Sequence, residues 1–157
     1  MVRSGIIWIL VGDRWNNRMG SNLFRHTLDD KQRLMVPASF RAMIGDSVAL
    51  TKGLHERCLF LFSVSEWETV KAAIRSSAKL TDPKARRFER HFVGSAYEGS
   101  VDKLGRIIVP QELRDYANIK KDVVVTALTS RIEIWDSASW DEEMEQFDPD
   151  ADMVIDI

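Results

Sequence analysis

The sequence is poor in cysteine, proline and glycine and has no long apolar run. Its 157 residues include one cysteine, four prolines and eight glycines, while 45% are hydrophobic. A lone cysteine forms neither an internal disulfide nor a cysteine-rich metal site, which fits a reducing cytosol. The longest apolar stretch, 5–12, has 8 residues, against the roughly 20 that a membrane span needs. We therefore expect a globular cytoplasmic protein that is not in a membrane.

Patterns of catalytic residues are also missing. Three histidines (His26, His55, His91) are scattered without the spacing of metal ligands. The chain contains no glycine-rich phosphate loop, no nucleophile elbow and no His-Glu-x-x-His motif. Cys58 lies in an apolar run, which favours a core position over a nucleophile. We expect no enzyme, no catalytic or metal site, no cofactor and no small-molecule substrate.

The small net charge of −2 conceals an uneven distribution. Residues 141–157 carry eight acidic side chains and no basic one, while residues 19–140 have a net charge of +4. A basic body with an acidic tail is typical of proteins that bind a polyanion. For the tail alone, a solvated terminus without a partner remains the simpler interpretation.

An internal repeat organises the chain. Residues 27–41 (TLDDKQRLMVPASFR) match residues 100–114 (SVDKLGRIIVPQELR) at an offset of 73, with five of fifteen positions identical. We infer a tandem duplication with halves at 19–78 and 92–145. The remaining segments are an N-terminal extension (1–18), a basic linker helix (79–91) and an acidic tail (146–157).

Each half predicts the same order of elements. A strand enters an Asp-x-x-x-Arg turn and a short apolar strand follows, then a short helix opened by proline, two further strands and a closing helix. Capping boxes are expected at Ser65 with Glu68 and at Ser139 with Glu142, with Met144 facing inward. Strands this short make a poor sheet alone. We therefore predict an α+β fold in which the halves share strands about a pseudo-twofold axis, with short helices outside.

The repeated turn has a structural interpretation. The carboxylates of Asp29 and Asp102 can accept backbone amides and stabilise the bend. Gly105 supplies a positive φ, as such turns often require. Gln32 stands at the equivalent position of the first copy, so that turn must differ or carry strain. The two aspartates could also meet as a catalytic pair, but an arginine four residues after each keeps it ionised.

A second interpretation rests on the cations that gather at the same turns. They are Lys31 and Arg33 in the first copy, Lys103 and Arg106 in the second, and Arg25 just before the first. A turn needs no such cations to fold. A phosphate backbone attracts them, and arginine can also read guanine through two hydrogen bonds.

The two copies of Asp-x-x-x-Arg, each followed by an apolar pair, Val-Pro and a short helix ending in arginine, resemble the MraZ family of bacterial transcriptional regulators. Further resembling segments are Glu56-Arg57-Cys58-Leu59, Ile132-Glu-Ile-Trp135-Asp136 and the arginine-rich helix at 85–90. The resemblance covers most of the chain, from Met19 to about Glu143. It implies a duplicated AbrB-like swapped-hairpin β-barrel of the SpoVT-AbrB type.

The resemblance also implies a function. Members bind double-stranded DNA at direct repeats in the promoter of the division and cell-wall gene cluster, their own gene included, and repress it. They act as ring-shaped homo-oligomers of about eight to twelve subunits, cytoplasmic and associated with the nucleoid. Carried over to this sequence, Arg33 and Arg106 are the DNA contacts, with Lys31, Lys103 and Arg25 beside them, while Asp29, Asp102 and Gly105 shape the turns.

Two other functions remain open. An antitoxin-like protein-interaction module would use the acidic tail as its binding segment, and a purely structural ring would bind no DNA. The extension is also outside the family pattern, because members begin ten residues before the first motif aspartate and Met19 is ten residues before Asp29. This spacing suggests a misassigned translation start rather than a domain at 1–18.

Overall fold

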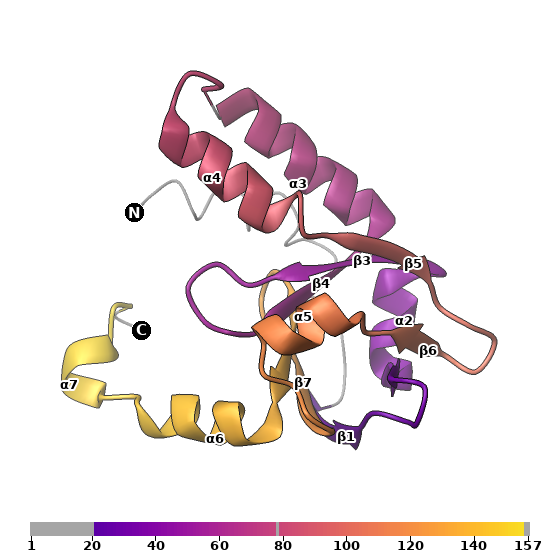
Figure 1. Cartoon of the computed structure of the whole chain (residues 1–157). Coiled ribbons are helices and arrows are strands. Elements are labelled where there is room, and N and C mark those ends of the chain that lie inside the picture. Colours follow the sequence, from indigo (N-terminus) through magenta and orange to yellow (C-terminus); the bar gives the residue numbers. More distant parts are fainter. Residues whose placement is uncertain (1–20, 78, 156–157) are drawn as a thin grey trace.

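The computed structural model describes residues 21–77 and 79–155, so the expected extension at 1–18 lies outside the described residues. An antiparallel sheet of six strands runs in the order β1-β7-β8-β4-β3-β5, and a separate two-stranded ladder joins β2 to β6 (Figure 1). The strands are β1 (Leu23–Thr27), β2 (Arg33–Met35), β3 (Ser47–Lys52), β4 (Leu59–Ser63), β5 (Tyr97–Ser100), β6 (Arg106–Ile108), β7 (Asp122–Ala127) and β8 (Ile132–Asp136).

The strand pairing shows that the two repeats are interlocked. β1 of the first repeat pairs with β7 of the second, and β5 of the second pairs with β3 of the first. The remaining cross-repeat pairs, β2 with β6 and β4 with β8, join equivalent strands. In β2·β6 Leu34 lies opposite Ile107, its own counterpart 73 residues later. The predicted sharing of strands about a pseudo-twofold axis is confirmed, and with it the α+β fold of the duplicated AbrB-like type.

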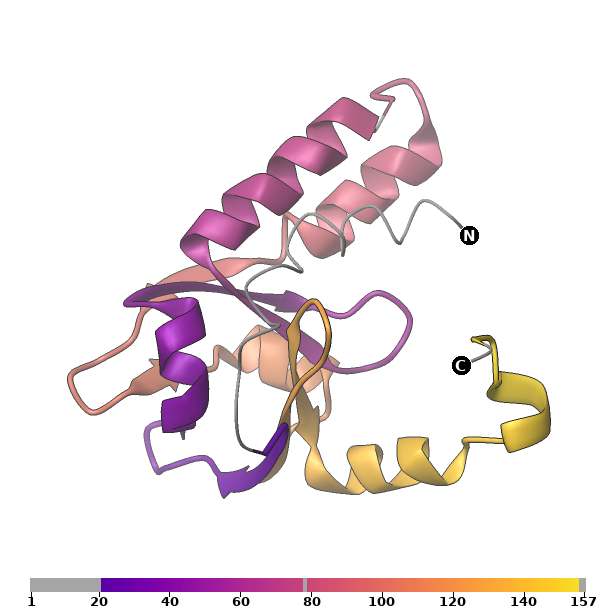
Figure 2. The ribbon, with the colours of Figure 1, turned by 180° about the vertical axis from the view of Figure 1, so that it is seen from behind.

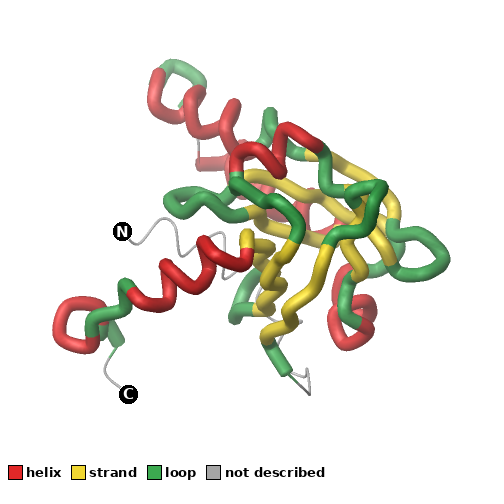
Figure 3. Tube along the Cα trace, turned by 60° about the horizontal axis from the view of Figure 1, so that its bottom comes forward, coloured by secondary structure: helices red, strands yellow, loops and turns green. Residues whose placement is uncertain are grey.

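Helices lie outside the strands, as Figure 3 shows for the part of the chain that is described. Two short helices follow the prolines of the repeated motif, and two longer helices form a hairpin between the repeats. The bounds are α2 (Ala38–Ile44), α3 (Val64–Ser77), α4 (Pro83–Phe92), α5 (Gln111–Tyr116), α6 (Ser137–Glu145) and α7 (Pro149–Asp152).

Alternation along the central strands divides the core in two. In β4, Leu59 and Leu61 belong to a cluster inside the curved sheet, while Phe60 and Phe62 belong to a second cluster on its outer face. This is the period of two that an extended chain imposes on its side chains. Because both faces are covered, all five residues of β4 are buried.

The inner cluster packs the small ladder against the large sheet and so holds the repeated turns in place. Leu34 and Ile107, from the small ladder, pack with the strands of the large sheet. Phe40 of α2 and Leu113 of α5 join them as equivalent residues of the two repeats. Each of these four side chains is at most 2% exposed. The ladder that carries the two Asp-x-x-x-Arg turns is thus fixed to the body of the fold by buried apolar contacts.

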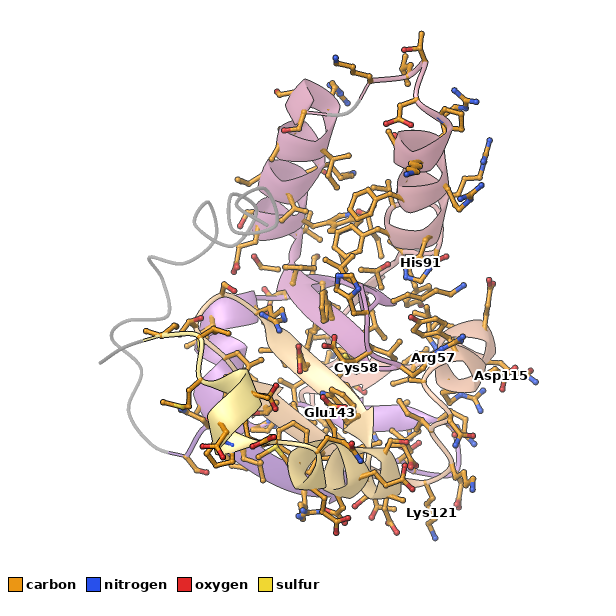
Figure 4. All side chains as sticks on the ribbon, turned by 90° about the vertical axis from the view of Figure 1, so that its left-hand side faces the viewer. Arg57, Cys58, His91, Asp115, Lys121 and Glu143 are labelled. Atoms are coloured by element: carbon orange, nitrogen blue, oxygen red, sulfur yellow. The ribbon has the colours of Figure 1, made fainter. Side chains whose placement is uncertain are left out.

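The outer cluster fastens the α3–α4 hairpin to the sheet. Phe92, at the end of α4, is fully buried among Trp67 of α3 and the phenylalanines of β4. At the foot of the hairpin, the Nε2–H of His91 donates to the carbonyl of Gly53 at 2.7 Å. Arg57, on the same loop as Gly53, stacks on the Tyr116 ring, and Figure 4 shows Arg57 and His91 on the same side of the molecule.

The cap of α3 differs from the expected one. The Ser63 hydroxyl accepts the Glu66 backbone N–H at 3.1 Å and donates to the Glu66 carboxylate at 3.0 Å. The serine cap therefore lies two residues before the expected pair of Ser65 and Glu68, because β4 passes into the helix without a loop. The helix buries one face, since Trp67, Val70 and Ile74 are all in the core.

The second closing helix, α6, also departs from expectation. Its cap is Asp136, whose carboxylate accepts the Ser139 backbone N–H, instead of Ser139 itself. Met144 is 56% exposed, so the prediction that it faces inward is wrong. The first half of the helix contacts the body, where Trp140 packs edge-to-face on Trp135.

Beyond α6 the chain leaves the body of the molecule. Figures 1 and 2 show α6 and α7 extending away from the strands toward the C-terminus. Every described residue from 141 to 155 is exposed, and the acidic tail includes the one-turn helix α7, capped by Asp148. The exposed large apolar residues of this segment are Met144, Phe147, Met153, Val154 and Ile155.

Candidate nucleic-acid interface

The first Asp-x-x-x-Arg bend, between β1 and β2, is organised by one carboxylate. Asp29 Oδ1 accepts the backbone N–H groups of Lys31 and Arg33, each at 2.9 Å. Its Oδ2 accepts the Nε–H of Arg33 at 2.7 Å. Asp29 therefore stabilises the bend and also restrains the arginine side chain through its Nε–H.

The second bend, between β5 and β6, repeats this arrangement. Asp102 Oδ1 accepts the backbone N–H groups of Leu104 and Arg106, and Oδ2 accepts the Arg106 Nε–H at 2.7 Å. Each bend also has the same backbone hydrogen bond, in which the N–H of the aspartate donates to the carbonyl of the arginine four residues later. In each bend, one carboxylate therefore accepts two backbone N–H groups and one guanidinium N–H.

The carboxylates of both bends stay ionised. Hydrogen bonds from the backbone N–H and guanidinium of Arg33 lower the pKa of Asp29, and those of Arg106 lower the pKa of Asp102. A lowered pKa in the folded state means that the stabilisation is complete above the ordinary carboxyl pKa and is lost as the pH falls through the lowered value. At neutral pH the two aspartates are therefore anions, unsuited to general acid catalysis.

The β2·β6 ladder brings the two bends together. Arg33 lies opposite Ile108, and Arg106 lies opposite Met35. A terminal nitrogen of Arg106 is 3.9 Å from Asp29 Oδ2, so one repeat's arginine reaches the other repeat's aspartate. Both bends project from the same side of the molecule (Figures 1 and 2). The sequence predicted two separate turns, and the fold joins them into one surface.

The sequence left open whether the first bend differs from the second or has the same shape under strain, and it has the same shape. Gln32 has φ of 60° and Gly105 has φ of 82°, so the same turn forms with and without a side chain. The carbonyl of each residue accepts a backbone N–H from the opposite repeat, Gln32 from Val109 and Gly105 from Val36. These symmetric bonds across the ladder hold Gln32 in the left-handed region that glycine favours.

Replacing Gln32 with glycine is expected to raise the free energy of unfolding by about 0.5–1 kcal/mol, because the left-handed backbone then carries no Cβ. Chemical denaturation measures the change. Gln32→Ala is the control, because it removes the polar side chain but keeps the Cβ at positive φ. An equal gain from Gln32→Ala would show that the side chain, not the backbone conformation, was the source.

The expected DNA-contacting cations fall into two groups. Lys31 and Lys103 are exposed at the tips of the bends, while Arg33 and Arg106 are half-buried beside their aspartates. Arg25 lies elsewhere, on β1, where its guanidinium pairs with Asp141 at 2.9 Å and donates to Ser137. The fold therefore brings four of the five predicted cations together, and Arg25 instead fastens α6 to the sheet.

Two arginines absent from the expected set also lie next to the bends. Arg41 of α2 donates from Nε to the Val36 carbonyl, and Arg114 of α5 makes the equivalent bond to Val109. The guanidinium of Arg41 covers Gly105 so closely that a Cβ there would collide with it. Both arginines are half-buried. The sequence offered one sign of their importance, because arginine stands at this position in both copies of the repeat. Identical residues in the two copies mark positions that contact the β2·β6 ladder in the same way.

No other chemistry gathers at this surface. In residues 21–77 and 79–155, no group of three histidine, cysteine or acidic side chains could hold a metal ion. Cys58 is fully buried, and burial raises the pKa of its thiol, which confirms the prediction of a core residue. No helix of the described part is long and apolar enough to cross a bilayer.

Comparison with known proteins matches the chain to one family over most of its length. The family model described as "MraZ protein, putative antitoxin-like" matches residues 19–91 and again residues 92–154. A "Transcriptional regulator MraZ" of Natranaerobius thermophilus is 42% identical over 137 residues, which cover 85% of this chain and 94% of the relative.

Other relatives agree. Proteins with the same name from Thermoanaerobacter pseudethanolicus and Desulfitobacterium hafniense are 43% and 44% identical, over 76% and 74% of this chain and 82% and 80% of their own lengths. The duplicated family match coincides with the two interlocked repeats of the fold. This chain belongs to the MraZ family.

Proposed function

We propose that this protein is a sequence-specific DNA-binding transcriptional regulator that contacts DNA through the two Asp-x-x-x-Arg bends. The relatives named above are transcriptional regulators by name. The proposal depends most on one observation, that two exposed cationic bends, one from each repeat, lie together on one side of the molecule. Lys31 and Lys103 supply the charge that attracts phosphate, and Arg33 and Arg106 supply oriented guanidinium groups.

The ion pairs suit the arginines to reading bases. A guanidinium held through Nε by a carboxylate keeps its terminal nitrogens in a fixed direction, so less side-chain entropy is lost when they bind DNA. The pair as a whole is nearly neutral, so the arginines add little to non-specific attraction. In this proposal, the lysines set affinity for any duplex and the arginines set preference for a sequence.

One pair of bends makes few phosphate contacts and binds weakly by itself. We therefore propose that the protein acts as a ring-shaped homo-oligomer of about eight to twelve subunits, which places several pairs of bends on successive direct repeats. Binding at one repeat raises the effective concentration at the next, provided that ring and repeat spacings agree. Occupation of its own promoter, upstream of the division and cell-wall genes, would repress that cluster.

A gel-shift titration on DNA from upstream of the protein's own gene tests the proposal. Two phosphate contacts, one from each exposed lysine, predict that affinity falls about tenfold or more between 50 and 200 mM salt. Lys31→Ala combined with Lys103→Ala is expected to weaken this dependence. A shift that is insensitive to salt, or no preference over unrelated DNA, would contradict the proposed function.

The acidic tail supports a second candidate, a protein-interaction module. Residues 146–155 are exposed and combine acidic with large apolar side chains, which are typical of a segment that binds another protein. Deleting residues 146–157 separates the candidates. The DNA-binding proposal expects the truncated protein to bind DNA at least as tightly as the full chain, since the tail repels phosphate. The protein-interaction candidate expects the truncated protein to lose its protein partner, and loss of DNA binding would contradict the DNA-binding proposal's expectation for the tail.

A further inference from the structure

The two bends have the same backbone but different surfaces. At the tip, the first bend has Lys31 where the second has Leu104. The backbone N–H of each residue donates to the carboxylate of the aspartate in its own bend. Leu104 is 59% exposed although it is a large apolar residue. Its neighbour Lys103 is exposed as well, so an apolar group stands beside a cation at the tip of the second bend only.

A second pair of equivalent positions also exposes more apolar surface in the second repeat. Ile108 on β6 is 51% exposed and lies opposite Arg33 in the ladder. Its counterpart Met35 on β2 is only partly exposed, and its sulfur is 3.1 Å from a terminal nitrogen of Arg41. The second bend therefore presents two exposed apolar side chains, where the first presents a lysine and a covered methionine.

An apolar side chain between cations fits the floor of the DNA major groove. There the C5-methyl group of thymine is the one apolar feature of the base edges, and phosphates flank it on both sides. Lys103 and Arg106 lie on either side of Leu104 in sequence, so that a lysine able to complement those phosphates and a base-reading arginine both stand near it. A protein partner would instead be expected to meet a wider apolar surface without flanking charge.

We propose that Leu104 reads a thymine methyl group, so that each subunit recognises an asymmetric site with a methyl-dependent half under the second bend. This inference rests on the proposed function, because it assumes that the bends face DNA. The pseudo-twofold symmetry of the fold alone would favour a palindromic site. The different residues at the two tips break that symmetry and give each subunit's site a direction, as a direct repeat requires.

The test compares two duplexes of the upstream region that differ only in the methyl group. One contains thymine, and the other is amplified with deoxyuridine in its place, which preserves base pairing. We expect the full-length wild-type protein to bind the thymine duplex about fourfold more tightly per site, the effect of burying one methyl group. Leu104→Ala is expected to lose this factor and to bind both duplexes equally. Leu80→Ala is the matched control, since Leu80 is 76% exposed on the α3–α4 connection, far in sequence from both bends.

Each other outcome has a definite meaning. Equal binding of both duplexes by the wild type, with preference over unrelated DNA retained, would overturn the methyl contact and leave the proposed function standing. A Leu104→Ala protein that still prefers thymine would show that another residue reads the methyl group. A change in the oligomeric mass of Leu104→Ala would identify Leu104 as a subunit contact and also overturn the inference. Absence of specific binding to either duplex would contradict the proposed function itself.

Discussion

Replacing Arg33 and Arg106 together with alanine is expected to lower affinity for the upstream DNA by about 100-fold or more, since each arginine that reads a base contributes about 1–3 kcal/mol. The two residues lie at diagonal positions of the β2·β6 ladder, and their side chains are held by Asp29 and Asp102. Their removal leaves two carboxylates on the surface that would face phosphate. Fluorescence anisotropy with a labelled duplex measures the loss.

Two variants separate reading of bases from simple attraction. Arg75→Ala with Arg87→Ala removes the same charge from exposed positions on α3 and α4 and is expected to change affinity little. Arg33→Lys with Arg106→Lys keeps the charge but not the planar fork, so it is expected to retain non-specific binding and lose preference for the upstream sequence. If the double alanine variant binds within about threefold of the wild type while remaining folded, the bends are not the interface.

The fold could be predicted from the sequence to a large extent because the chain repeats itself. Equivalent motifs 73 residues apart implied equivalent strands, and strands too short for a sheet implied that the halves share them. Phe40 and Ile44 are four residues apart in the sequence, the spacing of one helix face, and both are in the core of the fold. These inferences depend on periodicity and on local chemistry, which a single sequence records directly.

The sequence could not reveal features that depend on how distant parts of the chain meet in the folded structure. The position of a helix cap depends on whether a strand ends in a loop, and β4 and β8 run directly into helices, so the caps moved to Ser63 and Asp136. Arg25 looked like part of the cationic turn, and only the folded chain shows it paired with Asp141, 116 residues later. The contact from Arg106 to Asp29 likewise depends on the crossing of the two repeats.

The second large effect is expected in the outer core. Phe92→Ala is expected to lower the free energy of unfolding by about 3–5 kcal/mol, the usual cost of emptying a buried aromatic site. Phe92 is 0% exposed and its ring centroid lies 5.5 Å from those of Trp67 and Phe88. It joins α4 to α3 and to the phenylalanines of β4, so the cavity would open at the point where the hairpin meets the sheet. Urea denaturation followed by tryptophan fluorescence measures the loss.

Phe147→Ala is the matched control, because Phe147 is 53% exposed on the C-terminal segment and its truncation is expected to change stability by less than about 0.5 kcal/mol. The inner core is made of other residues, so the β2·β6 ladder and both bends are expected to keep their arrangement wherever Phe92→Ala remains folded. Its affinity for DNA should then match that of the wild type below the unfolding transition. A loss of less than about 1 kcal/mol would show that the α3–α4 hairpin is held mainly by other contacts, and a loss of DNA affinity in the folded variant would show that the two cores are coupled.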